Sequence, residues 1–231
     1  MLQLFTARSP VVFKILIALE ELGLSFESHP IDVPGGGQLD PAYKKVNPNS
    51  RVPALLDTEP ADGGPPFPIF ESGAILIYLA EKHGRFLPTE MRARSQVLQW
   101  VMWQMSGLGP TMGQARHFRH FSLGDQDYSV TRFTNEATRL FSVLDKQLEG
   151  KSFVCGEEYT IADICCWPWL LYSSSNGQDM ESFANLSRWF KAVGERPAVM
   201  RVAERWWKDI PIESAMPLDE KTRAILFNRT R

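Results

Sequence analysis

The residues best suited to bind a small zwitterion are Phe70-Glu71-Ser72-Gly73, where a strand pattern ends and a helical pattern begins. The first turn of a helix offers free N–H groups and partial positive charge, which suit a carboxylate. Ser72 adds a hydroxyl donor, and Glu71 can pair with an ammonium group. The pattern therefore fits an amino-acid head group that carries both charges. The alternative is a plain helix N-cap without a ligand.

Ser9 precedes Pro10 at the start of another helical pattern, which predicts an N-cap followed by proline at the first helical position. As a cap, Ser9 would stabilise the helix by about 1 kcal/mol. As a catalytic group, its hydroxyl would donate to a thiolate at the same helix end. Ionising a thiol of ordinary pKa at neutral pH requires about 2.7 kcal/mol, which a charge-assisted hydrogen bond and a helix N-terminus can supply. The two roles are compatible.

Val52-Pro53 stands directly before an apolar strand pattern. A proline at this point turns the preceding backbone N–H and C=O outward, where they can pair with a ligand. An ordinary trans turn is the alternative, because only about 5–6% of such bonds are cis in folded proteins.

Three further groups favour structural roles. Thr160-Ile161-Ala162-Asp163 fits a capping box, so Asp163 is expected to be structural rather than catalytic. His117 and His120 are spaced for one helix face, but neighbouring arginines oppose a metal, so a solvated or cleft-lining patch is favoured and no metal is expected. The three cysteines, Cys155, Cys165 and Cys166, lack a CxxC spacing. Buried inert thiols are the favoured interpretation.

The front of the chain predicts a small α/β unit. Short strands are expected at Leu2–Thr6, Phe26–Val33, Ala54–Asp57 and Phe67–Phe70. Helices are expected after Ser9 and over Ser72–Lys82. The order βαβ followed by ββα, in about 80 residues, is that of a thioredoxin-like domain.

The rear of the chain predicts an all-helical bundle. Its expected helices are Met91–Met105, Ser129–Gly150, Ile161–Ser173, Phe183–Glu195 and Pro197–Lys208. All seven tryptophans lie at or after Trp100, whereas prolines concentrate in the front. We therefore expect a thioredoxin-like domain over residues 1–83, a linker over 84–90 and a helical domain over 91–231. The tail, residues 209–231, has no interpretable pattern.

Composition excludes several classes of function. With 25 basic and 27 acidic residues the net charge is −2, which disfavours a nucleic-acid partner. The apolar runs are too short for the roughly 20 residues that span a bilayer. The first ten residues lack the features of a secretory signal, so we expect a cytoplasmic protein. No cysteine occurs before Cys155, so thiol chemistry in the front unit requires a borrowed thiol.

Taken together, these residues make the chain resemble a cytosolic glutathione transferase over essentially its whole length. The resemblance depends on three motifs in order, Arg51-Val52-Pro53-Ala54-Leu55, Phe70-Glu71-Ser72-Gly73-Ala74-Ile75 and Thr160-Ile161-Ala162-Asp163. The closer resemblance is to the Nu-class branch, known as disulfide-bond reductases. Its marks are Gly36-Gly37-Gln38, Ser106-Gly107-Leu108-Gly109-Pro110, Gln114, His117-Phe118, His120, Tyr128 and Arg132.

The resemblance implies roles for individual residues. Glu71 and Ser72 would hold the γ-glutamyl group, and Val52 before a cis Pro53 would pair with the cysteinyl backbone. Gln38 and Arg132 match positions that contact glutathione. Two glutathione molecules, or one glutathione disulfide, would bind per subunit of a homodimer, and no protein cysteine would be required.

One departure stands at the first helix, where the branch usually has Thr-Pro-Asn and this chain has Ser9-Pro10-Val11. Ser9 keeps the hydroxyl, while Val11 offers only its backbone N–H.

Three functions follow from these residues. The first is reduction of disulfides by bound glutathione. The second is conjugation of glutathione to an electrophile, or a related reaction of the same thiolate. The expected substrate pocket would contain Trp100, Gln104, Met112, His117 and Phe118. The third is a non-catalytic binding module with the same fold, and the joint presence of Ser9, Val52-Pro53 and Glu71-Ser72 argues against it.

Overall fold

A four-stranded mixed sheet forms the front of the molecule. The computed structural model describes residues 1–208 and 218–227. Strands β1 (Leu2–Thr6), β2 (Phe26–Pro30), β3 (Ala54–Asp57) and β4 (Phe67–Phe70) lie in the order β2-β1-β3-β4. β1 is parallel to β2 and antiparallel to β3, and β3 is antiparallel to β4. Pro68 lies in the outermost strand β4, a position where the sheet loses little from its missing N–H.

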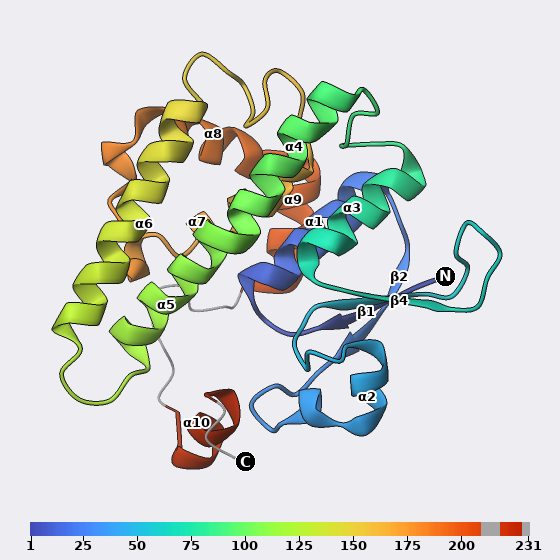
Figure 1. The fold of residues 1–231 in the computed structure, drawn as a ribbon, viewed down its shortest axis with the longest axis horizontal. Coiled ribbons are helices and arrows are strands. Elements are labelled where there is room, and N and C mark those ends of the chain that lie inside the picture. Colours follow the sequence, from blue (N-terminus) through green and yellow to red (C-terminus); the bar gives the residue numbers. More distant parts are fainter. Residues whose placement is uncertain (209–217, 228–231) are drawn as a thin grey trace.

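Two helices separate this sheet from the helical part of the molecule. Figure 1 shows α1 (Pro10–Leu22) and α3 (Ser72–His83) between the sheet and the rear helices, with α2 (Pro41–Val46) across the sheet from them. Every residue of α1 from Val12 to Leu19 is buried. A helix that is buried on all sides must be apolar on all sides, which explains the run Val11-Val12-Phe13 and Ile15–Leu19.

The rear of the chain is helical. A long rod consists of α4 (Met91–Trp103), a π-helical turn at Gln104–Leu108 and α5 (Gly109–His120), and α6 (Asp127–Gln147) packs beside it. Then come α7 (Ile161–Leu170), α8 (Ala184–Gly194), α9 (Pro197–Val202) with a π-helical turn at Ala203–Trp207, and α10 (Glu220–Leu226). None of the helices in the described part of the chain is long and apolar enough to cross a bilayer.

The predicted fold class, a thioredoxin-like sheet followed by an all-helical bundle, is confirmed. Three helices were not predicted. α5 was missed because Gly107, Gly109 and Pro110 resemble a break, whereas the π-helical turn carries the chain into a new helix with proline in its first turn. α2 and α10 were missed because each is only six or seven residues long. Residues 209–217 and 228–231 of the tail lie outside the described residues.

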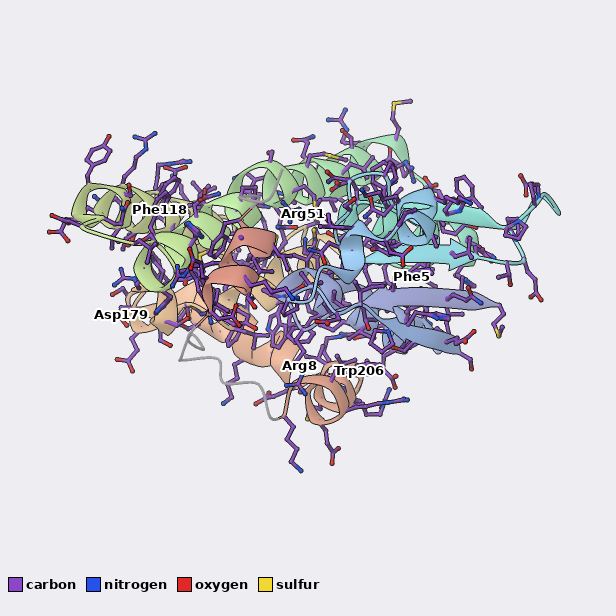
Figure 2. All side chains as sticks on the ribbon, turned by 90° about the horizontal axis from the view of Figure 1, so that it is seen from below. Phe5, Arg8, Arg51, Phe118, Asp179 and Trp206 are labelled. Atoms are coloured by element: carbon purple, nitrogen blue, oxygen red, sulfur yellow. The ribbon has the colours of Figure 1, made fainter. Side chains whose placement is uncertain are left out.

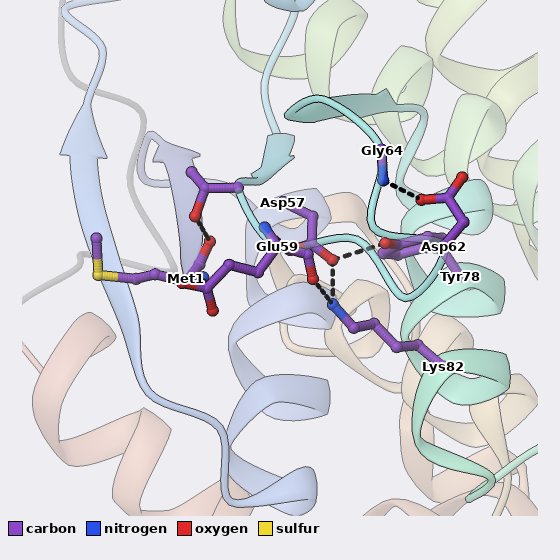
Figure 3. A network of polar contacts seen from close by, with 8 residues as sticks. Met1, Asp57, Glu59, Asp62, Gly64, Tyr78 and Lys82 are labelled. Carbon is purple, nitrogen blue, oxygen red and sulfur yellow. Dashed lines mark hydrogen bonds and ion pairs between the residues drawn. The ribbon is translucent and has the colours of Figure 1, made fainter.

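Asp57, at the end of β3, anchors the sheet to α3 (Figure 3). Its buried carboxylate accepts hydrogen bonds from Tyr78 Oη at 2.6 Å, from Lys82 Nζ and from the Glu59 backbone N–H at 3.0 Å. Burial alone would raise the pKa of Asp57, but these hydrogen bonds outweigh burial and hold the pKa below its usual value. The charged carboxylate therefore stabilises the fold at neutral pH.

Asp163 has the structural role that the sequence predicts. Thr160 and Asp163 form a reciprocal capping box at the start of α7. The Asp163 carboxylate also accepts from the Val154 backbone N–H at 2.8 Å and from Trp189 Nε1 at 2.9 Å. This fully buried carboxylate has no exposed surface with which to contact a substrate.

The front and rear parts share one core and are joined by an ion pair. Glu21, near the end of α1, accepts two hydrogen bonds from Arg196, at 2.6 and 3.0 Å. The Arg196 guanidinium also lies 3.7 Å from the centroid of the Tyr159 ring. A bidentate pair backed by an aromatic face fixes the angle between the parts more firmly than an isolated exposed ion pair.

Candidate functional site

The strand register gathers the predicted binding residues at one end of the sheet. Ala54 pairs with both Phe5 of β1 and Phe70 of β4. Because both pairs are antiparallel, the carboxyl ends of β1 and β4 meet the amino end of β3. The segments that leave or enter the sheet there are Ser9-Pro10, Val52-Pro53 and Glu71-Ser72. The Val52-Pro53 peptide bond is cis, as the resemblance implied.

Ser9 caps α1 at this end of the sheet. Its Oγ accepts a hydrogen bond from the Val12 N–H at 3.3 Å, and its backbone is extended, as for an N-cap. Accepting that bond leaves the hydroxyl hydrogen of Ser9 available to a ligand. The N–H of Val11 has no acceptor within its own helix, because the first turn of a helix has none to offer. The predicted cap is confirmed, and the catalytic role stays a prediction.

Glu71 and Ser72 occupy the start of α3. Glu71 has φ of 69° and ψ of 116°, a conformation that non-glycine residues adopt at a cost of about 1–3 kcal/mol. Its side chain is exposed, whereas Ser72 is buried at the first turn of the helix. The surrounding structure must hold this residue in place, and its role in ligand binding stays a prediction.

Gln38 lies in a short 3-10 turn, Gly37–Leu39, that follows the glycine-rich segment. Only 2% of its surface is exposed, and its Oε1 is buried without a hydrogen-bond partner in the described part of the chain. A buried amide oxygen that lacks a donor costs free energy, so a ligand N–H would stabilise it. Because this oxygen is itself buried, the predicted contact of Gln38 with glutathione stays a prediction.

Lys14 is the residue that the sequence interpretation missed. Although it lies in α1, 1% of its surface is exposed. Its Nζ donates to Ser72 Oγ at 3.2 Å and to Gln104 Oε1, and it lies 3.5 Å from Met105 Sδ. The signal in the sequence was a single lysine within the apolar run Val11–Leu19, which is buried on all sides from Val12 onward.

The protein thiols are poorly suited to redox chemistry. Burial, reinforced by the Asp163 carboxylate, raises the pKa of Cys155 to about 12. Cys165 and Cys166 are fully buried in α7, and burial raises the pKa of both thiols. Thiolates are the reactive form, so the raised pKa values disfavour a reaction at these three cysteines. The prediction of buried thiols is right for Cys165 and Cys166, whereas Cys155 is half-buried.

The histidines predicted to line a cleft lie at the end of α5. His120 Nε2 is 2.7 Å from the Ser175 backbone oxygen, and the His117 ring packs edge-on against Phe227 with centroids 4.5 Å apart. Within residues 1–208 and 218–227, no three potential metal ligands gather at one point.

α10 connects this end of α5 with the glycine-rich segment. Arg223 donates to the Phe121 backbone oxygen. On the other side, Ile225 lies 3.8 Å from where a Cβ of Gly36 would stand. Figure 1 shows α10 beside α2 and below α5.

The predicted substrate pocket is not formed by its five residues together. Gln104 and Met112 are 1% exposed and belong to the core, so they do not line an open pocket. Trp100 lies about 27 Å along the helical rod from Phe118, at a rise of 1.5 Å per residue. It faces a hollow of about 500 Å³ shared with Trp103, Gln96, Gln99, Gln147, Lys151 and Cys155. His117 and Phe118, at the end of α5, are half-buried, and their place in a substrate pocket stays a prediction.

Figure 2 shows Phe118 over the helical part of the molecule, well separated from Phe5 on the sheet. The Phe118 ring is stacked on Phe133 of α6, with centroids 5.4 Å apart. Arg132 lies on the exposed side of α6, in a hollow with Tyr128 and Glu136. Its contact with glutathione stays a prediction.

The sheet, the two helix N-termini and the helical bundle define a glutathione transferase. Residues 8–82 match the family model for the glutathione S-transferase N-terminal domain, and residues 124–197 match that for the C-terminal domain. The chain belongs to the glutathione transferase family.

Within this family, the chain is similar to one curated disulfide-bond oxidoreductase and to solved structures with bound glutathione. The disulfide-bond oxidoreductase YfcG of Escherichia coli is 42% identical over 198 residues, which are 86% of this chain and 92% of the relative. A glutathione transferase structure from Burkholderia graminis, with two glutathione molecules bound per subunit, superposes with a TM-score of 0.84 at 38% identity and covers 90% of this chain and 89% of its own. One from Pseudomonas putida, with one glutathione disulfide bound per subunit, gives 0.82 at 39% identity and covers 87% and 89%.

Proposed function

We propose that this protein is a glutathione-dependent disulfide-bond oxidoreductase that uses bound glutathione as its thiol. One observation carries the proposal: Ser9, Val52-Pro53 and Glu71-Ser72 meet at one end of the sheet, between two helix N-termini, in a protein with two fully buried thiols and a third, Cys155, that is half-buried with a raised pKa. The name of the Escherichia coli relative and the ligands of the two structural neighbours support the same activity.

The site has a complementary group for each part of glutathione. The Glu71 carboxylate would pair with the γ-glutamyl ammonium, and Ser72 with the first turn of α3 would bind the α-carboxylate. The Val52 backbone would pair with the cysteinyl backbone, and Gln38 Oε1 would accept from a ligand N–H. Glutathione would then lie with its thiol toward Ser9 and the N-terminus of α1.

Ser9 and the start of α1 would favour the thiolate. The hydroxyl of Ser9 would donate to the sulfur, and the partial positive charge of the helix end, with the Val11 N–H, would lower the free energy of the anion. A charge-assisted hydrogen bond together with the helix end is worth about the 2.7 kcal/mol that ionisation at neutral pH requires.

The reaction would proceed in two exchanges. The glutathione thiolate attacks one sulfur of the substrate disulfide, forms a mixed disulfide and releases the other sulfur as a thiolate. A second glutathione thiolate then attacks the glutathione sulfur of the mixed disulfide and releases the second substrate thiolate. Two glutathiones are oxidised to glutathione disulfide, one substrate disulfide is reduced to two thiols, and the protons lost by glutathione go to the products.

The test is a steady-state assay that compares hydroxyethyl disulfide with chlorodinitrobenzene, with glutathione supplied to both. We expect turnover of the disulfide to exceed conjugation of the aromatic electrophile. The opposite ranking would replace this proposal with conjugation, and the absence of both activities would leave a binding module.

A pair of variants separates the two roles of Ser9. Ser9→Ala removes both the cap and the hydroxyl donor, whereas Ser9→Gly removes the donor but costs only a few tenths of a kcal/mol as a cap. Both variants should lower kcat/KM about 10- to 100-fold, while only Ser9→Ala should lower the free energy of unfolding by about 1 kcal/mol. Full activity in Ser9→Gly would show that Ser9 is only a cap.

We further propose a homodimer that works in the cytoplasm. Along α4 a stripe of apolar side chains faces outward, with Met91 83% and Met102 53% exposed and Leu98 between them. Exposed apolar stripes of this kind mark protein interfaces. Sedimentation of Met102→Glu should show monomers where the wild type is dimeric, and an unchanged dimer would exclude this face.

The proposal of a cytoplasmic location has separate support, because the three free cysteines suit a reducing compartment.

A further inference from the structure

Lys14 is a buried lysine whose hydrogen-bond partners in the described part of the chain are all neutral groups. Around its Nζ lie the Ser72 hydroxyl, the Gln104 carbonyl oxygen and the Met105 sulfur. The indole of Trp169 lies 5.7 Å away, from Nζ to the ring centroid. No carboxylate forms an ion pair with Lys14 among the residues that the structure describes.

The titratable groups nearest to Lys14 do not neutralise it. Burial lowers the pKa of Lys14, while Cys165, Cys166 and the more distant Glu71 oppose that effect. Both thiols are buried and have raised pKa values, so they are protonated at neutral pH. A buried ammonium without an anion is costly, and an anion that arrives next to it lowers that cost.

We propose that Lys14 is a positioning residue for the γ-glutamyl α-carboxylate of glutathione and acts on it through Ser72. The inference rests on the proposed function, because that function places the carboxylate at Ser72.

The hydrogen-bond geometry gives the reason. A hydroxyl has one hydrogen to donate and two lone pairs that accept. Lys14 donates to Ser72 Oγ, so the Ser72 hydrogen must point away from the ammonium. In the structure its acceptor is Met105 Sδ at 3.4 Å, and a thioether sulfur is a weak acceptor. A carboxylate at the start of α3 would be a stronger acceptor for the same hydrogen, and its charge would balance the ammonium beneath it.

The test compares glutathione with an analogue that lacks only the γ-glutamyl α-carboxylate, 4-aminobutyryl-cysteinyl-glycine. Binding of each is measured by calorimetry to the wild type, to Lys14→Met and to Lys191→Met. The methionine side chain is one atom shorter than that of lysine and carries no charge, and Lys191 is an exposed lysine on α8 that serves as the matched control.

Lys14→Met should weaken glutathione binding about tenfold, because the bound carboxylate loses the charge that balances it and Ser72 loses the donor that orients its hydroxyl. Binding of the analogue should be nearly unchanged, and Lys191→Met should bind both ligands as the wild type does. In steady state, KM for glutathione should rise while kcat at saturation stays near the wild-type value. In a Ser72→Ala background, Lys14→Met should cause a smaller further loss.

Equal weakening of both ligands, or no weakening of glutathione, would overturn the role of Lys14. If Glu71→Gln and Ser72→Ala also leave glutathione binding unchanged, the proposed function itself fails. If those two variants bind weakly and Lys14→Met does not, only the inference about Lys14 fails.

A measurement on the wild type covers the case in which Lys14→Met does not fold. In protein labelled with nitrogen-15 lysine, the Nζ resonance of Lys14 should shift more with glutathione than with the analogue. Equal shifts with the two ligands would overturn the inference.

Discussion

Glu71 allows binding to be separated from folding, because its backbone is strained and its side chain is exposed. With φ of 69° and ψ of 116°, the residue occupies a region that glycine enters at no steric cost. Glu71→Ala and Glu71→Gly remove the same carboxylate. Only glycine also relieves the backbone strain.

The expected magnitudes differ for stability and for binding. The strained conformation lowers the stability of the fold by about 1–3 kcal/mol for a non-glycine residue. Glycine avoids this strain, but it loses more conformational entropy on folding, which offsets the gain by about 0.5–1 kcal/mol. Glu71→Gly should therefore be more stable than Glu71→Ala by roughly 1 kcal/mol. Loss of the partner of the glutathione ammonium should cost both variants about 1.5 kcal/mol, or about tenfold in affinity. We take the lower end of the range because solvent screens an exposed carboxylate.

The assay combines urea denaturation with calorimetric titration of glutathione and of glutathione disulfide. The reasoning predicts equal losses of affinity in the two variants and a higher free energy of unfolding in Glu71→Gly. Unchanged affinity in both would remove Glu71 from the site. Affinity lost in Glu71→Gly but kept in Glu71→Ala would show that the rigid backbone, and not the carboxylate, is what the ligand requires.

Two further predictions concern stability and the thiols. Because the pKa of Asp57 is depressed in the fold, its contribution to the free energy of unfolding should be fully present above the ordinary carboxyl pKa and lost as the pH falls through the folded pKa. The unfolding free energies of Asp57→Asn and the wild type should therefore differ at pH 7 and converge below about pH 4. If urea denaturation gives the same difference at every pH, the assignment is wrong. A variant that combines Cys155→Ser, Cys165→Ala and Cys166→Ala should keep most of its disulfide reductase activity per folded molecule, and a loss beyond its loss of stability would indicate a protein thiol in the reaction.

The features that could be predicted from sequence are those set by neighbouring residues. The N-cap of Ser9, the capping box of Thr160 and Asp163, and the strand-to-helix junction at Glu71-Ser72 each depend on fewer than about six consecutive residues. The order of strands and helices then sufficed for the fold class, because it restricts how strands can pair.

The features that could not be predicted depend on the path of the chain between distant residues. The pocket residues were grouped by type, but Trp100 and Phe118 lie far apart on one helical rod. That rod continues through Gly107–Pro110 because a π-helical turn replaces the expected break. Lys14 gave no local signal for a ligand, since its surroundings come from residues 58 to 155 positions away.

Because of these long-range contacts, both parts of the molecule contribute to the glutathione site. The sheet end supplies the groups that would touch glutathione, whereas Gln104 and Met105, at the start of the π-helical turn, contact the ammonium of Lys14. These two residues are adjacent in the chain, and the Lys14 ammonium contacts both of their side chains. The helical part therefore fixes Lys14 against Ser72 from behind. Glutathione would supply its thiol at the front part of the chain, whereas the rear part holds the side chain of Lys14 in place behind the glutathione site.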